Sequence, residues 1–125
     1  MNFQYEKLIH NKIKSLALFI RSTETHFEYD EDALTQYTKG SIVFVDNSQL
    51  QFSEKYSDKG HRYRFQYMNK NKELIIRWDN SPHYPKIETF PHHKHIKNNL
   101  KPSKDINLIE VLDFIIEYIL FNIEI

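Results

Sequence analysis

The chain has 125 residues, of which 40% are hydrophobic and 14% aromatic, and its formal net charge at pH 7 is zero. This length predicts one domain, residues 1–125, whose core needs no covalent crosslinks, and the neutral balance argues against a generally basic surface for nucleic acid. Because cysteine is absent, disulfides, thiolate nucleophiles and cysteine metal ligands are excluded, and a cytoplasmic protein is the simplest expectation.

The N-terminal segment is expected to form an amphipathic helix. Residues 3–16 place Tyr5, Ile9, Ile13 and Leu16 at helical spacing, with lysines off this stripe. The residues that follow, SLALFI, fit a buried strand equally well. Because charges run through the first half of this region and its apolar run is short, no signal peptide is expected.

The middle of the chain predicts an antiparallel meander of about five to six strands. Apolar and polar residues alternate in HRYRFQYM, and SIVFV and LIIRWD are short apolar runs. Turn-forming residues separate these runs at 46–48, 58–60 and 69–73. Strands of this kind share one half-buried face, so another layer must cover it.

The C-terminal segment supplies that layer as a second helix. Asn107 and Glu110, three residues apart, resemble a capping box, and Asp105 is a rival N-cap. The expected apolar stripe consists of Ile109, Leu112, Ile116, Ile119 and Ile123. Acidic residues interrupt it, so no membrane span is expected. We therefore expect an α+β fold, in which an antiparallel β-meander packs against an N-terminal and a long C-terminal helix.

A cluster of histidines lies between these two parts. The chain has seven histidines, and four of them fall between residues 83 and 95, beside three of its four prolines. From Pro82 to Lys104 the only acid is Glu88, against five lysines. We expect a long loop, ordered by proline, that runs from a strand end toward the last helix, and such loops commonly carry functional sites. Histidine suits proton transfer, metal ligation and phosphate contact.

The motifs YRFQY, RWDN, PHYP and TFPHHKH, in this order, resemble the TumE-type toxins of toxin–antitoxin systems. The similarity is best from Tyr56 to Ile96 and weaker in the last helix. This chain has Trp78 where the family usually has tyrosine, and Tyr84 where it often has histidine. The resemblance implies a small intracellular toxin that is paired with a DNA-binding antitoxin.

The residue types in this cluster fit metal-independent RNA cleavage. That reaction needs a base for the 2′-hydroxyl proton, an acid for the leaving 5′-oxygen and cations for the phosphate. Two histidines together with Lys or Arg supply these groups, and a carboxylate can orient a histidine. The predicted catalytic residues are His83, His92, His93, His95 and Asp79. This interpretation requires no cofactor and no metal.

Substrate-binding residues follow from the same chemistry. Arg77 and Lys94 are expected to hold phosphate oxygens, and Tyr63 or Tyr67 would stack a base if their strand face lies outside the core. The protein is interpreted as a toxin that acts as an endoribonuclease on RNA. Its expected partners are the RNA substrate and a cognate DNA-binding antitoxin. A homodimer stays an open alternative, and no membrane contact is expected.

Two rival functions use the same residues. In the first, His93 and His95 lie on one side of an extended backbone and bind a metal with His83 or Asp79, although the charge of Lys94 counts against this. In the second, the basic loop is a non-enzymatic module that binds nucleic acid or a partner protein.

A purely structural interpretation also stands. Arg77 and Asp79 could form a surface ion pair of little energetic value. The aromatic residues of the strands, Tyr63 and Tyr67 among them, fit a core. The three histidines outside the cluster would then be solvated or stacking residues without function; these are His10, His26 and His61.

Overall fold

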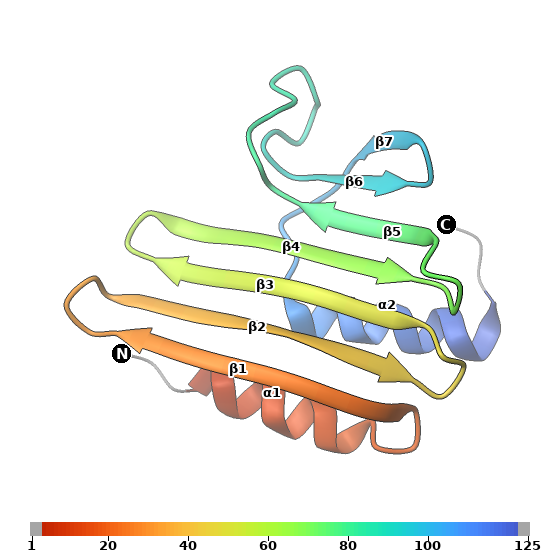
Figure 1. Ribbon diagram of the computed structural model, residues 1–125. Coiled ribbons are helices and arrows are strands. Elements are labelled where there is room, and N and C mark those ends of the chain that lie inside the picture. Colours follow the sequence, from red (N-terminus) through yellow and green to blue (C-terminus); the bar gives the residue numbers. More distant parts are fainter. Residues whose placement is uncertain (1–3, 123–125) are drawn as a thin grey trace.

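Seven strands form one antiparallel sheet in chain order, and two helices lie on one of its faces (Figure 1). The computed structural model describes residues 4–122. The strands are β1 (Ile20–Asp30), β2 (Thr35–Phe44), β3 (Gln49–Ser57), β4 (Gly60–Met68), β5 (Leu74–Asp79), β6 (His93–Ile96) and β7 (Asn99–Pro102). The helices are α1 (Gln4–Ser15) and α2 (Leu108–Phe121). The α+β class is therefore confirmed.

The sheet has seven strands rather than the expected five to six, because the histidine-rich segment is partly a hairpin. Strands β6 and β7 occupy residues that we expected to be loop. Their turn places Lys97 at φ 56°, a left-handed conformation that lysine seldom adopts, so no glycine signals the turn. Pro102 ends the edge strand β7, where a missing N–H removes no ladder hydrogen bond.

The two helices lie where the sequence predicts them. Helix α1 covers residues 4–15 of the expected 3–16: residue 3 lies outside the described residues, and Leu16 already belongs to a turn. That turn spans residues 16–19 and leads into β1, so SLALFI is not a buried strand. Helix α2 has 14 residues and begins after Asn107, which forms a capping box with Glu110. The Glu110 N–H donates to Asn107 Oδ1 at 2.9 Å, and the Asn107 N–H donates to Glu110 Oε1 at 3.3 Å. Asp105 is not the cap, and Ile123 lies outside the described residues.

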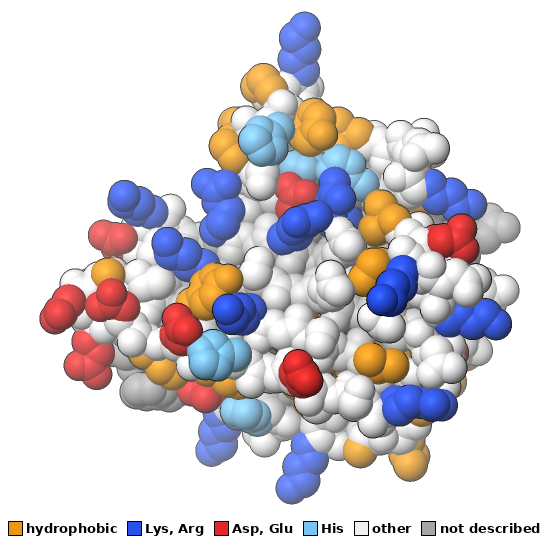
Figure 2. All heavy atoms as spheres, viewed as in Figure 1, with side chains coloured by type: hydrophobic (Ala, Val, Ile, Leu, Met, Phe, Trp, Pro, Cys, Tyr) orange, Lys and Arg blue, Asp and Glu red, His pale blue; other side chains and the backbone are white. Residues whose placement is uncertain are grey.

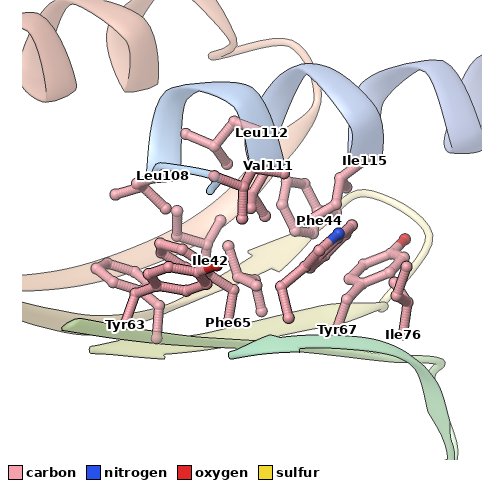
Figure 3. Close-up of a cluster of buried hydrophobic side chains, with 14 of the residues drawn as sticks. Ile42, Phe44, Tyr63, Phe65, Tyr67, Ile76, Leu108, Val111, Leu112 and Ile115 are labelled. Carbon is pink, nitrogen blue, oxygen red and sulfur yellow. The ribbon is translucent and has the colours of Figure 1, made fainter. Parts of the chain in front are cut away.

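The core lies between the sheet and α2 (Figure 3). Side chains from β2, β4 and β5 meet one face of the helix. The labelled core residues are Ile42, Phe44, Tyr63, Phe65, Tyr67, Ile76, Leu108, Val111, Leu112 and Ile115, and each is at most 2% exposed. Complete burial of one such side chain contributes about 1.5–3 kcal/mol to folding. Both helices use the same face, so the opposite face of the sheet is left open (Figure 1).

Candidate functional site

The open face of β5 and β6 carries a cluster of an aspartate, an arginine and two histidines. Cross-strand pairing places Asp79 beside His93, and Arg77 beside His95. Side chains two residues apart on a strand share a face, so all four point away from the helices. Figure 2 views this face and shows histidine and basic side chains gathered around an acidic one in its upper part.

Asp79 holds the cluster together. It is 7% exposed, and its Oδ1 accepts hydrogen bonds from His93 Nε2 at 2.8 Å and from the Ser81 N–H at 3.1 Å. Its Oδ2 lies 3.5 Å from Arg77 Nε. Arg77 and Asp79 therefore do not form the surface ion pair that a structural interpretation expects, because the Asp79 carboxylate is buried and has several partners. A buried charge of this kind is costly to leave unpaired.

His93 is the most buried side chain of the cluster. Its side chain is 1% exposed, and its Nδ1 lies 2.9 Å from the carbonyl oxygen of Pro91. Both of its ring nitrogens therefore face acceptors, the second being the Asp79 carboxylate. With both nitrogens engaged, His93 holds the Asp79 carboxylate in place.

His95, whose side chain is 15% exposed, is less buried than Asp79 and His93. Its ring lies 5.0 Å from that of His93, and its Nε2 is 3.8 Å from Asp79 Oδ2, beyond hydrogen-bond distance. Burial lowers the pKa of His95, and the charge of Arg77 lowers it further. His95 is consequently a neutral imidazole at pH 7, the form that accepts a proton.

Two residues that the sequence analysis did not select also belong to this cluster. Arg64 pairs across the sheet with Asp79 and contributes to the lowered pKa of His95. The Tyr84 ring lies 4.9 Å from that of His93 and 5.8 Å from that of His95. The alternation in HRYRFQYM, which puts arginines opposite the aromatic face, is the signal that could have identified Arg64. His83 is exposed, with its ring 6.5 Å from that of Tyr84.

Other predicted site residues lie on the face of the helices. Lys94 pairs with buried Trp78 and lines a hollow beside α2, so it is separated from Arg77 by the sheet. Tyr63 and Tyr67 are 2% and 0% exposed, so their strand face is the core and the condition set for base stacking is not met. His92 turns toward this side as well, and its Nδ1 lies 2.8 Å from the Tyr63 hydroxyl. The histidine run is thus divided between two faces.

The cluster also has the geometry of a cation site. The donor atoms of Asp79, His93 and His95 lie within 4.8 Å of one another. Two histidines and one carboxylate can bind a divalent transition metal, and the bond from His93 to a backbone carbonyl is typical of metal-ligating histidines. Arg77, close to the same carboxylate, opposes cation binding electrostatically.

A second histidine network lies at the rim of the core. The His61 side chain is 11% exposed, stacks on Tyr56 at 4.2 Å and has a carboxylate at each ring nitrogen. Its Nε2 is 2.6 Å from Glu54 Oε2, and its Nδ1 is 2.8 Å from Asp105 Oδ1. The Tyr5 hydroxyl donates to Glu54 Oε1 at 2.5 Å. Of the two alternatives expected for His61, solvated or stacking, the structure shows stacking, with two carboxylates in addition, whereas His10 and His26 are exposed.

This network ties both helices to the sheet. The Leu108 N–H, in the first turn of α2, donates to the Tyr5 hydroxyl of α1 at 3.2 Å. Burial alone lowers the pKa of His61, but the hydrogen bonds to Glu54 and Asp105 outweigh it, so the pKa is raised above 6.5. Below pH 6.5 His61 is therefore mainly an imidazolium, paired with a fully buried carboxylate.

Replacing His61 with alanine is expected to lower the free energy of unfolding by about 3 kcal/mol near pH 6, because Glu54 loses its cation. A histidine with a raised pKa contributes stability that is complete below the unfolded-state pKa of 6.5 and is lost as pH rises through the folded-state value. The difference from the parent should therefore shrink at higher pH. Urea unfolding at several pH values tests this, with exposed His26→Ala as the control. A pH-independent loss would contradict the charged pair.

The fold and this cluster define a small α+β protein with a polar, histidine-containing site on an uncovered sheet. A protein-family profile described as Toxin TumE matches residues 6–119, so the chain belongs to the TumE toxin family. The resemblance seen in the sequence is confirmed, and a toxin role implies an antitoxin partner. Searches of curated proteins and of solved structures found no match. Within residues 4–122, neither helix has the length and apolar character to cross a membrane.

Proposed function

We propose that this toxin cleaves RNA without a metal, with His95 as the general base. The observation that carries the proposal is the position of this neutral imidazole between Arg77 and the Asp79–His93 pair on the open sheet face. His95 would take the proton of the 2′-hydroxyl, whose oxygen then attacks the adjacent phosphorus. The bond to the 5′-oxygen breaks and leaves a 2′,3′-cyclic phosphate.

The remaining roles follow from position. Arg77 lies opposite His95, and Arg64 lies opposite Asp79 on the next strand. Both would hold the charged phosphate as it passes through the pentavalent state. His83, exposed in the loop that carries Tyr84, is the candidate acid for the leaving 5′-oxygen. His92 and Lys94 are not assigned roles at the reacting atoms, because they face the helices.

Expression in cells tests the proposal. Induction of the parent chain should stop growth and degrade RNA, and induction of His95→Ala at the same protein level should do neither. A toxic parent chain that leaves cellular RNA intact would refute RNA cleavage. The non-enzymatic alternative, a module that binds nucleic acid or a partner through the same face, would then replace it.

The metal-dependent alternative is favoured by the convergence of Asp79, His93 and His95. In that mechanism the cation, rather than His95, would activate the nucleophile. Loss of cleavage in EDTA, followed by recovery with zinc or manganese, would establish it in place of the histidine base.

The proposed partner is a DNA-binding antitoxin that covers the basic segment from residue 82 to 104. Lys97 and Lys101 are exposed on the β6–β7 hairpin and would attract an acidic segment of the antitoxin. Replacing both with glutamate should weaken binding and reduce its dependence on salt, as measured by calorimetry at two ionic strengths. Unchanged affinity at low salt would place the inhibitory contact elsewhere. A homodimer is the remaining alternative for this surface.

A further inference from the structure

Two ladders of outward-facing side chains cross the open face from β1 to β6. The first consists of Glu24, Ser41, Gln51, Gln66, Arg77 and His95. The second consists of His26, Lys39, Ser53, Arg64, Asp79 and His93. Neighbouring strands are about 5 Å apart, so each ladder forms a continuous row. The proposed catalytic cluster is the end of a polar strip that extends over six of the seven strands.

The strip is hollowed at its centre. Ser41 and Ser53 are the smallest side chains of the two ladders, and longer side chains surround them on β2, β3 and β4. The result is a cavity of about 570 Å³ whose lining includes Lys39, Gln51, Arg64 and Gln66. In Figure 2 the middle of this face consists largely of uncharged polar groups and backbone, in contrast to its charged periphery.

The lining has the chemistry that recognises a nucleotide. Gln51 and Gln66 each place a carboxamide in the lining, a group whose donors and acceptor match the edges of nucleobases. Gln66 Oε1 accepts from Arg64 Nη2 at 3.1 Å, an exposed hydrogen bond that a bound base would replace. Lys39 and Arg64 supply positive charge for flanking phosphates. The hollow lies two strands from β5, a distance of about 10 Å, which a short stretch of single strand can span from the catalytic cluster.

We propose that this hollow binds an unpaired nucleotide next to the cleavage point, so that the substrate is single-stranded RNA. A base that is paired and stacked in a duplex presents only its groove edges and cannot enter a recess in a sheet, whereas an unpaired base can be turned into it. The inference rests on the proposed function, because it takes the Asp79–His95 cluster as the place of cleavage.

The test measures binding separately from cleavage. The His95→Ala chain is titrated with a fluorescein-labelled single-stranded RNA and with the same RNA annealed to its complement, and anisotropy reports binding. The single strand should bind at least about tenfold more tightly than the duplex. Equal affinities for the two forms would overturn the inference.

Two matched pairs of variants locate the binding surface. Ser53→Tyr fills the hollow and should weaken single-strand binding by about tenfold, whereas Ser57→Tyr, on the same face of β3 but outside the hollow, should not. Arg64→Ala should weaken binding more than Arg62→Ala, its exposed neighbour on the same face of β4. If Ser53→Tyr fails to fold, the double variant Gln51→Ala/Gln66→Ala replaces it, because it only shortens exposed and half-buried side chains.

The outcomes separate this inference from the proposed function. If the parent cleaves no RNA but binds single strands, and Ser53→Tyr weakens that binding, the result would support binding in the hollow and refute the nuclease proposal. If the parent cleaves RNA and the folded Ser53→Tyr variant does so with the same KM and the same base preference, the nuclease proposal stands. The proposal that the hollow binds a nucleotide would then be overturned.

Discussion

Replacing His95 with alanine is expected to reduce RNA cleavage by about 10²–10⁴-fold, the usual contribution of a general base. The Nε2 of His95 lies beyond hydrogen-bond distance of the Asp79 carboxylate, unlike that of His93. Because its side chain is 15% exposed and forms no close ion pair, the free energy of unfolding should fall by about 1–2 kcal/mol, far less than a loss of activity of about 10²-fold through unfolding would require. A fluorogenic RNA assay and urea unfolding measure the two quantities.

The pH dependence of cleavage provides a second readout for His95. Its surroundings are Arg77, His93, Asp79 and Arg64, and burial together with the cations lowers its pKa below 6.5. A base with a lowered pKa stays neutral as pH falls, so the acidic limb of the kcat/KM profile should lie below pH 6.5. The exposed His10→Ala variant should keep the parent profile. A His95→Ala chain that retains both rate and profile would exclude His95 as the base.

Replacing Asp79 with alanine is expected to affect stability as well as activity. The carboxylate is buried and accepts from His93 Nε2 and the Ser81 N–H. Its removal leaves a buried imidazole and the Arg77 side chain without their partner, so the free energy of unfolding should fall by about 3–5 kcal/mol. Cleavage should be lost too, because His93 and Asp79 position the cluster.

The matched control is Asp113→Ala, which removes an exposed carboxylate that is paired with Lys12 on the helix side. That change should cost less than about 1 kcal/mol, as exposed ion pairs do. Thermal and urea unfolding of both variants make the comparison. An Asp79→Ala chain that is as stable as Asp113→Ala would show that the Asp79 contacts contribute little to folding.

Local sequence patterns predict those helices and strands that are determined by residues close together in the chain. The spacing of Tyr5, Ile9 and Ile13 predicts α1, and the pair Asn107 and Glu110 predicts the start of α2, since both signals lie within a turn or two of helix. The β3–β5 meander follows from alternation and turn residues. The β6–β7 hairpin does not, because its turn depends on Lys97 in a conformation that its side chain gives no reason to expect.

That missed hairpin explains which of the predicted site residues lie together in the structure. In a loop, His92, His93, Lys94 and His95 could all converge, but in and beside a strand they alternate between faces. His93 and His95 point outward and lie beside Asp79 and Arg77, whereas His92 and Lys94 face the helices. Likewise His61 meets Asp105 across 44 residues, a contact that no local pattern indicates.

The product ends of RNA cleaved by the purified chain in EDTA test the central proposal most directly. The parent should cleave single-stranded RNA in the presence of the chelator and leave 2′,3′-cyclic phosphate or 3′-phosphate ends, and His95→Ala should leave the RNA intact. Two results would contradict a histidine base: cleavage by the parent only after zinc or manganese is added back, or products with 5′-phosphate and free 3′-hydroxyl ends. Either result would point to the metal geometry of Asp79, His93 and His95.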